Sequence, residues 1–90
     1  MFEKSLNEMT ATVTVEDRES LLADQHGVTI EAGSLTLTWS QAKTLALKLD
    51  KAIAGGITYK TMENRLRALR NSLVWAFGPE AEEDIKNENA

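Results

Sequence analysis

The sequence predicts an α+β fold, in which a small antiparallel sheet packs against a helical hairpin. Residues 9–15, 28–31 and 35–39 alternate apolar and polar side chains, which is the period of a strand with one buried face. Residues 39–54 and 59–77 instead repeat apolar side chains at helical spacing. Because the strand-like segments come before the helical ones, we expect one sheet covered on its apolar face by two helices, and not a parallel α/β arrangement.

Three strands are expected, at residues 9–15, 28–31 and 35–39. The second and third are predicted to form a hairpin through Gly33, because glycine supplies the positive φ that a tight turn requires. In the first strand the threonines lie on one face, and the apolar face consists of Met9, Ala11, Val13 and Val15. The apolar face of the hairpin consists of Val28, Ile30, Leu35, Leu37 and Trp39.

Residues 16–27 fit two interpretations. Asp17 can begin a short helix that ends near Gly27. Alternatively, Ser20–Ala23 form a further strand, which turns into Val28. We favour the strand and turn, which would make the sheet a small meander.

Local signals define the first helix, residues 39–54. Thr38 and Gln41 form a capping-box pattern, in which each side chain satisfies a free backbone N–H at the start of the helix. Gly55 and Gly56 end the helix. Its apolar side consists of Ala42, Leu45, Ala46, Leu49, Ala52 and Ile53.

The second helix is predicted at residues 59–77. Thr58 is a good N-cap residue, and Pro79 ends the helix because proline lacks a backbone donor and disfavours helix in the residue before it. The apolar line of this helix consists of Met62, Leu66, Leu69, Leu73 and Phe77.

The two ends of the chain differ from its middle. Residues 79–90 are acidic and contain one bulky apolar side chain, Ile85, so we expect a disordered acidic tail there. Residues 1–8 lack a sustained apolar pattern and are expected to be a flexible N-terminus. The single α+β domain would then span residues 9–78, a size at which one hydrophobic core is marginal and self-association or a partner becomes relevant.

The sequence carries no combination of residues that indicates an enzyme. It has no cysteine and one histidine, His26, in a predicted turn, whereas a zinc site needs several imidazole or thiolate ligands. We therefore expect no catalytic residue, no cofactor, no metal and no small-molecule substrate. The charged N-terminus and the absence of a long apolar run predict a cytoplasmic protein without membrane contact.

Charge is segregated along the chain, although the net charge is −4. Residues 43–70 carry seven Lys and Arg against two acids, whereas residues 71–90 carry five acids against one lysine. Residues 1–42 are also acidic, with seven acids against two bases. Such a pattern can steer partners by the sign of their charge.

On a helical projection, both helices are apolar on a second side. Val74 and Trp75 lie away from the buried line of the second helix, and Leu47 lies away from that of the first. A chain this small is not expected to expose these side chains together without a partner. We therefore predict a docking surface for a larger protein or for a second copy, anchored by Trp75, Val74 and Leu47 and oriented by Arg67 and Arg70.

The basic helix also suggests an alternative, binding to DNA. The side opposite its buried line presents Lys60, Asn64, Arg67 and Asn71, residue types that contact phosphates and base edges. The segment GITYKTMENRLR, residues 56–67, resembles the turn and recognition helix of LuxR-type helix-turn-helix domains. The matching positions are Gly56, Ile57, Thr58, Lys60, Thr61, Met62 and Asn64. The resemblance implies that Lys60, Asn64 and Arg67 would face DNA.

Two main hypotheses follow. The first is a small non-enzymatic protein-interaction module, comparable to the regulators and inhibitors that phages and mobile elements encode. The alternative is a helix-turn-helix-like DNA-binding transcriptional regulator that uses residues 56–71. A domain with purely structural duties is a third, less specific hypothesis.

Overall fold

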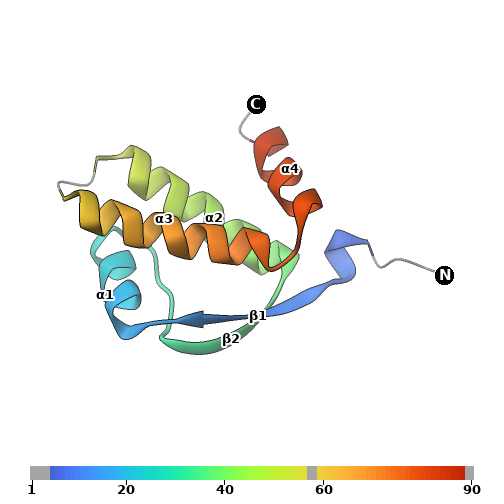
Figure 1. The fold of residues 1–90 in the computed structure, drawn as a ribbon, viewed down its shortest axis with the longest axis horizontal. Helices are drawn as coiled ribbons and strands as arrows, with labels where there is room; N and C mark the ends of the chain where they lie inside the picture. Colours follow the sequence, from blue (N-terminus) through green and yellow to red (C-terminus); the bar gives the residue numbers. More distant parts are fainter. Residues whose placement is uncertain (1–4, 57–58, 89–90) are drawn as a thin grey trace.

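The computed structural model describes residues 5–56 and 59–88 of the chain. The elements in chain order are the 3₁₀ turn η1 (Leu6–Glu8), β1 (Thr10–Val15), α1 (Asp17–Gln25), β2 (Gly33–Thr38), α2 (Trp39–Ala54), α3 (Lys60–Trp75) and α4 (Pro79–Glu88). The α+β class is therefore confirmed. Figure 1 shows the sheet on one side of the paired helices α2 and α3, with α4 rising from their other side.

The sheet consists of β1 and β2, which pair in antiparallel orientation from Thr10 opposite Thr38 to Val15 opposite Gly33. The predicted hairpin between residues 28–31 and 35–39 is therefore wrong, because β2 pairs with β1 and residues 28–31 form no strand. Gly33 does have a positive φ of 114°, but it begins β2 instead of forming a tight hairpin turn.

Residues 28–31 misled the prediction because their alternation comes from burial and not from strand pairing. Val28 and Ile30 insert into the core from an extended connection between α1 and β2. The Ser20 hydroxyl of α1 donates to the Ile30 carbonyl at 2.6 Å, which holds this connection against the helix. A side chain buried from an extended segment produces the same period of two as a strand does.

The predicted faces of the first strand are confirmed. Val13 and Val15 are buried, whereas the three threonines of β1 are exposed. The threonines line up with Thr38, Thr36 and Ser34 of β2, and the Thr12 and Thr36 hydroxyls lie 3.1 Å apart. One face of the sheet thus packs on the helices, and the other is a hydroxyl-rich surface.

Residues 17–25 form helix α1, so the strand-and-turn interpretation that we favoured is wrong and the helical alternative is correct. Glu16 occupies the N-cap position, and its backbone N–H donates to the Glu19 carboxylate at 3.1 Å. Glutamate is not among the preferred N-cap residues, so the sequence gives only a weak signal for the start of this helix. Gly27 follows the helix with a φ of 78°, as in a typical left-handed helix termination.

Helix α2 has the predicted bounds, Trp39–Ala54. The predicted capping box is present, since the Thr38 N–H donates to Gln41 Oε1 at 2.9 Å and the Gln41 N–H donates to Thr38 Oγ1 at 3.3 Å. Trp39, which the sequence suggested as the end of a strand, is the first residue of the helix and is fully buried.

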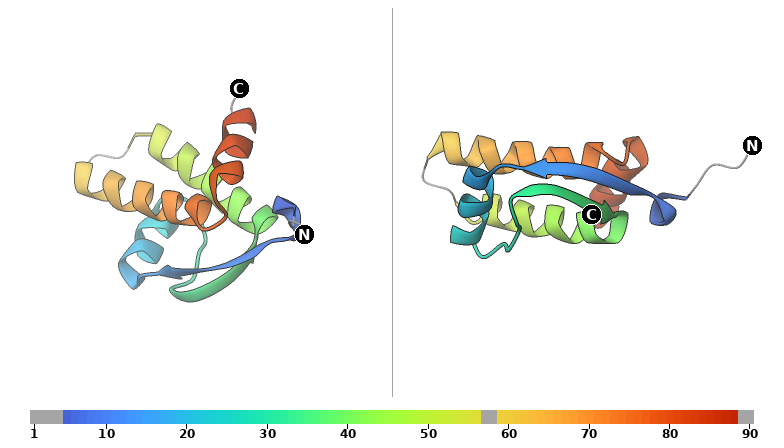
Figure 2. Two further views of the ribbon diagram at one scale, coloured as in Figure 1. Left: turned by 45° about the vertical axis from the view of Figure 1, so that its right-hand side comes forward. Right: turned by 90° about the horizontal axis from the view of Figure 1, so that it is seen from below.

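Helix α3 is shorter at both ends than the predicted 59–77. The predicted cap, Thr58, lies outside the described residues. Leu66, Leu69 and Leu73 are buried as expected. Figures 1 and 2 show α3 lying side by side with α2 over most of its length.

The predicted disordered tail is wrong for residues 79–88, which form helix α4. Pro79 is the first helical residue, a position that suits proline because no intrahelical donor is needed there. Ala81 and Ile85 lie one turn apart and are both buried in the core cluster. Because only two residues of this highly charged segment are buried, its composition does not indicate an amphipathic helix.

The predicted flexible N-terminus, residues 1–8, lies partly outside the described residues. Within it, Leu6 belongs to η1 and packs against the core while remaining partly exposed. In the part of the chain that the structure describes, no helix is both long and apolar enough to cross a membrane.

Candidate protein-docking surface

Trp75 is the most exposed of the large apolar side chains described, with 68% of its surface accessible. It lies at the C-terminal end of α3, beside a groove of about 710 Å³ between α3 and α4. We call this the Trp75 groove; its lining residues are Trp75, Gly78, Pro79, Glu80, Glu82, Glu83 and Lys86. The predicted surface anchor thus lies at the surface, next to a hollow.

The turn between α3 and α4 builds this groove. Gly78 has a φ of 92°, and its N–H donates to the Trp75 carbonyl at 3.2 Å. The Gly78 carbonyl in turn accepts from the Ala81 N–H at 3.1 Å, which starts α4. Because only glycine adopts such a φ without strain, the sequence Gly78-Pro79 determines where α4 leaves α3.

The groove is acidic. It contains three glutamates and one lysine, of which Glu82 also contacts Arg70 at 3.5 Å. This differs from the predicted docking surface, in which Arg67 and Arg70 accompany Trp75. Glutamates replace the arginines because the segment predicted to be a disordered tail folds back as α4.

Arg70, which was predicted to orient a partner, is engaged within the fold. Only 13% of its side chain is exposed, and its Nε donates to Asp50 Oδ1 at 3.1 Å. Its NH1 lies 3.2 Å from Asn71 Oδ1 and 3.5 Å from Glu82 Oε2. Arg70 therefore connects α2, α3 and α4 from within the fold.

Two of the predicted apolar anchors also lie elsewhere. Val74 is fully buried, so it offers a partner no surface. Val74 belongs to the same core cluster as Ala81 and Ile85 of α4, a helix that contacts both α2 and α3. Leu47 is half-buried and lines a second groove of about 510 Å³, together with Asp50, Lys51, Ala54 and Glu88. Trp75, Val74 and Leu47 thus do not form one patch.

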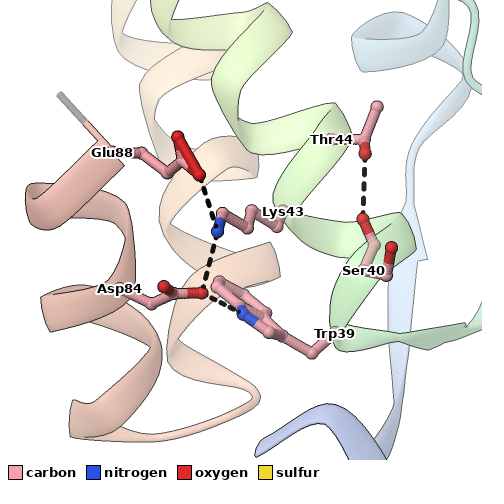
Figure 3. Close-up of polar contacts among 6 residues, drawn as sticks. All are labelled: Trp39, Ser40, Lys43, Thr44, Asp84 and Glu88. Carbon is pink, nitrogen blue, oxygen red and sulfur yellow. Dashed lines mark hydrogen bonds and ion pairs between the residues drawn. The ribbon is translucent and has the colours of Figure 1, made fainter.

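Polar contacts fasten α4 to the start of α2, as Figure 3 shows. Trp39 Nε1 donates to Asp84 Oδ2 at 2.7 Å, and Lys43 Nζ lies 3.1 Å from the same oxygen. Lys43 also contacts Glu88 Oε1 at 3.2 Å. The hydrogen bond from Trp39, followed by that from Lys43, lowers the pKa of Asp84, and the hydrogen bond to Asp84 raises the pKa of Lys43. We call Trp39, Lys43, Asp84 and Glu88 the α4 clamp.

The basic surface predicted for DNA binding is present in part. Lys60, Asn64 and Arg67 lie on one side of α3 and are exposed. Glu63 lies between them, 2.7 Å from Lys60 Nζ and 3.8 Å from Arg67 NH2, and the hydrogen bond from Lys60 lowers the pKa of Glu63. Asn71 is only half-exposed, and its Oδ1 accepts from Arg70.

The packing of α2 and α3 also differs from a helix-turn-helix. In that motif the two helices cross at roughly 90–120°. Here they run side by side as a helical hairpin (Figures 1 and 2). A DNA-binding role would therefore depend on the surface of α3 alone and not on helix-turn-helix geometry.

The described residues contain no group of three or more His, Cys, Asp or Glu arranged to hold a metal ion. His26, the single histidine, is half-buried at the C-terminal end of α1. Comparison with protein-family models, curated proteins and solved structures finds no match to this chain. We therefore infer its function from the surface alone.

Proposed function

We propose that this protein is a small non-enzymatic interaction module, which docks onto a larger protein through the Trp75 groove. The observation that carries this proposal is the exposure of 68% of an indole beside a hollow of about 710 Å³. Tryptophan is enriched among the residues that dominate binding energy at interfaces, because it buries a large rigid area on association. Occupying a surface of a larger protein is the way in which a small regulator or inhibitor acts.

The chemistry of the groove favours a basic segment of the partner. Glu80, Glu82 and Glu83 outnumber Lys86 in the lining, so the local charge is negative. An arginine or lysine side chain can stack on the indole face and donate to a neighbouring carboxylate. Nucleic acid is a poor occupant for the same reason, since the carboxylates repel phosphates.

Titration with a basic peptide tests this proposal. The ¹⁵N-labelled protein is titrated with a capped hexa-arginine peptide, and a capped hexa-glutamate peptide serves as the control ligand. We expect the indole N–H signal of Trp75 to shift saturably, while the signal of Trp39, which is buried and bonded to Asp84, moves little. Raising the salt concentration should weaken binding, because the attraction is between exposed charges.

Variants locate the binding site. Trp75→Ala should abolish saturable binding, and Glu80→Gln/Glu83→Gln should weaken it about tenfold, at about 0.7 kcal/mol for each exposed charge. Leu21→Ala is the matched control, because Leu21 is 66% exposed but lies on α1, outside the groove. Equal affinity of the wild type and Trp75→Ala for the peptide would exclude the groove as the docking site.

DNA binding by α3 remains the second candidate, favoured by the joint exposure of Lys60, Asn64 and Arg67 on one side of the helix. It is tested by measuring affinity for random duplex DNA across a salt series. If α3 binds phosphates, Lys60→Ala/Arg67→Ala should reduce the slope of log affinity against log salt by about two. Absence of binding to duplex DNA at low salt would eliminate this candidate.

A further inference from the structure

The outer edge of β1 has no backbone partner among residues 5–56 and 59–88. β1 pairs on one side with β2, and no backbone hydrogen bond of the described residues joins its other side to a loop or helix. Figure 2 shows the two strands lying beneath α3 and α2, with the β1 edge on the α3 side. A strand edge of this kind presents N–H and carbonyl groups that can pair with another strand.

This edge lacks the features that usually prevent pairing. Residues 10–15, Thr-Ala-Thr-Val-Thr-Val, contain no charge and no proline, and five of the six side chains are β-branched. Monomeric proteins protect such edges with lysine, proline, bulges or a covering element.

We propose that two copies of this chain associate by antiparallel pairing of their β1 strands, which makes one four-stranded sheet. A second copy suits this edge because the strand matches itself. In an antiparallel pair, directly opposed residues lie on the same face of the sheet. The two apolar faces therefore become continuous only if the two-fold axis lies midway between one β1 residue and the same residue of the second copy. The alternation of β1 satisfies this condition without any gap in the pattern.

Charge selects between the two registers that pair five of the six β1 residues. An axis at Thr12 would place Glu8 opposite Glu16 of the second copy, and directly opposed like charges are destabilising. An axis at Val13 avoids this clash. It places Val13 opposite its own counterpart and Thr12 opposite Thr14 of the second copy, while Glu16 lies opposite an uncharged threonine. The hydroxyl-rich outer face then continues across the interface.

The salt dependence of this association has the opposite sign to that of basic-peptide binding. The chain carries a net charge of −4, so two copies repel each other electrostatically. Added salt screens this repulsion and should strengthen the dimer. The same salt should weaken binding of a basic peptide in the Trp75 groove.

Sedimentation equilibrium of charge-swapped variants tests the pairing. In the Val13-centred register, Thr12→Lys/Thr14→Lys places lysine opposite lysine twice, and Thr12→Glu/Thr14→Glu does the same with glutamate. Each variant alone should raise the dimer dissociation constant about tenfold, at roughly 0.7 kcal/mol for each of the two repulsive pairs. Mixing the two variants should restore association as a heterodimer, because every repulsive pair becomes an attractive one.

Ser34→Lys/Thr36→Lys is the matched control, since these residues lie on the same exposed face but on β2. It should dimerise as the wild type does, and far-UV circular dichroism confirms that each variant folds. A monomeric wild type at millimolar concentration, or a failure of the mixture to associate, would overturn the proposal. Loss of dimer in the control with retention in Thr12→Lys/Thr14→Lys would also overturn it, because β2 would then be the edge that pairs. Trp75→Ala should leave the dimer intact, so this result is separate from that of peptide binding.

Discussion

Replacing Ile85 by alanine should lower the free energy of unfolding by about 2–4 kcal/mol. Ile85 is 1% exposed and, with Ala81, is one of the two buried residues of α4. Truncating a buried isoleucine to alanine costs about 2–5 kcal/mol, because transfer energy is lost and a cavity remains. Alanine is the better helix former by a few tenths of a kcal/mol, which offsets a small part of this loss.

Urea unfolding, followed by circular dichroism and tryptophan fluorescence, measures the effect. Glu83→Ala is the control on the same helix, because Glu83 is exposed and its replacement should change stability by less than about 0.5 kcal/mol. Amide hydrogen exchange of residues 79–88 shows in addition whether α4 detaches before the rest unfolds. Equal unfolding free energies for Ile85→Ala and Glu83→Ala would refute the docked helix and restore the disordered tail.

Three further predictions concern the contacts around α4. The hydrogen bonds from Trp39 and Lys43 lower the pKa of Asp84 in the folded protein. The contribution of Asp84 to folding stability is therefore complete above the ordinary aspartate pKa of about 4, and it is lost as the pH falls through the lower pKa of the folded state. An acid titration should therefore shift the Trp39 indole N–H signal in the wild type, and Asp84→Asn should remove that step. Arg70→Met should cost about 1–3 kcal/mol in urea unfolding because Asp50 loses its partner, yet it should not weaken peptide binding, since Glu82 in the groove also loses a competing cation; a large loss of affinity would contradict a structural role. Gly78→Ala should lower the thermal midpoint by several degrees, because φ is 92° there; an unchanged midpoint would show that this turn relaxes without strain.

Local signals predicted the parts of the fold that local interactions determine. The bounds of α2 follow from a capping box at Thr38 and from glycine after Ala54, and both signals act within one turn of the helix. The buried face of β1 follows in the same way from strict alternation. These elements need no knowledge of the rest of the chain.

The errors arose where tertiary contacts decide. Val28 and Ile30 alternate because the core buries them from a connection, and the strand pairing that this alternation suggested joins β2 to β1 instead. Helix α4 depends on Ala81 and Ile85 reaching a core that other elements supply. Composition alone cannot reveal such a contact.

The candidate site was predictable in part for the same reason. A helical projection correctly places Trp75 away from the buried leucines of α3. It places its neighbour Val74 there as well, although Val74 is fully buried. The acidic lining of the Trp75 groove comes from α4, a helix that the sequence did not predict, so periodicity in α3 could not reveal it.

Helix α4 carries the Trp75 groove on one side and the α4 clamp on the other. Binding of a ligand in the groove is therefore coupled to the attachment of α4 to α2. Glu82 and Glu83 line the groove, while Asp84 and Glu88 contact Lys43 on α2. A ligand that binds only the attached helix stabilises it by about 2.7 kcal/mol at a hundredfold excess over its dissociation constant. Resistance of α4 to a protease therefore reports, without any label, whether a ligand occupies the Trp75 groove.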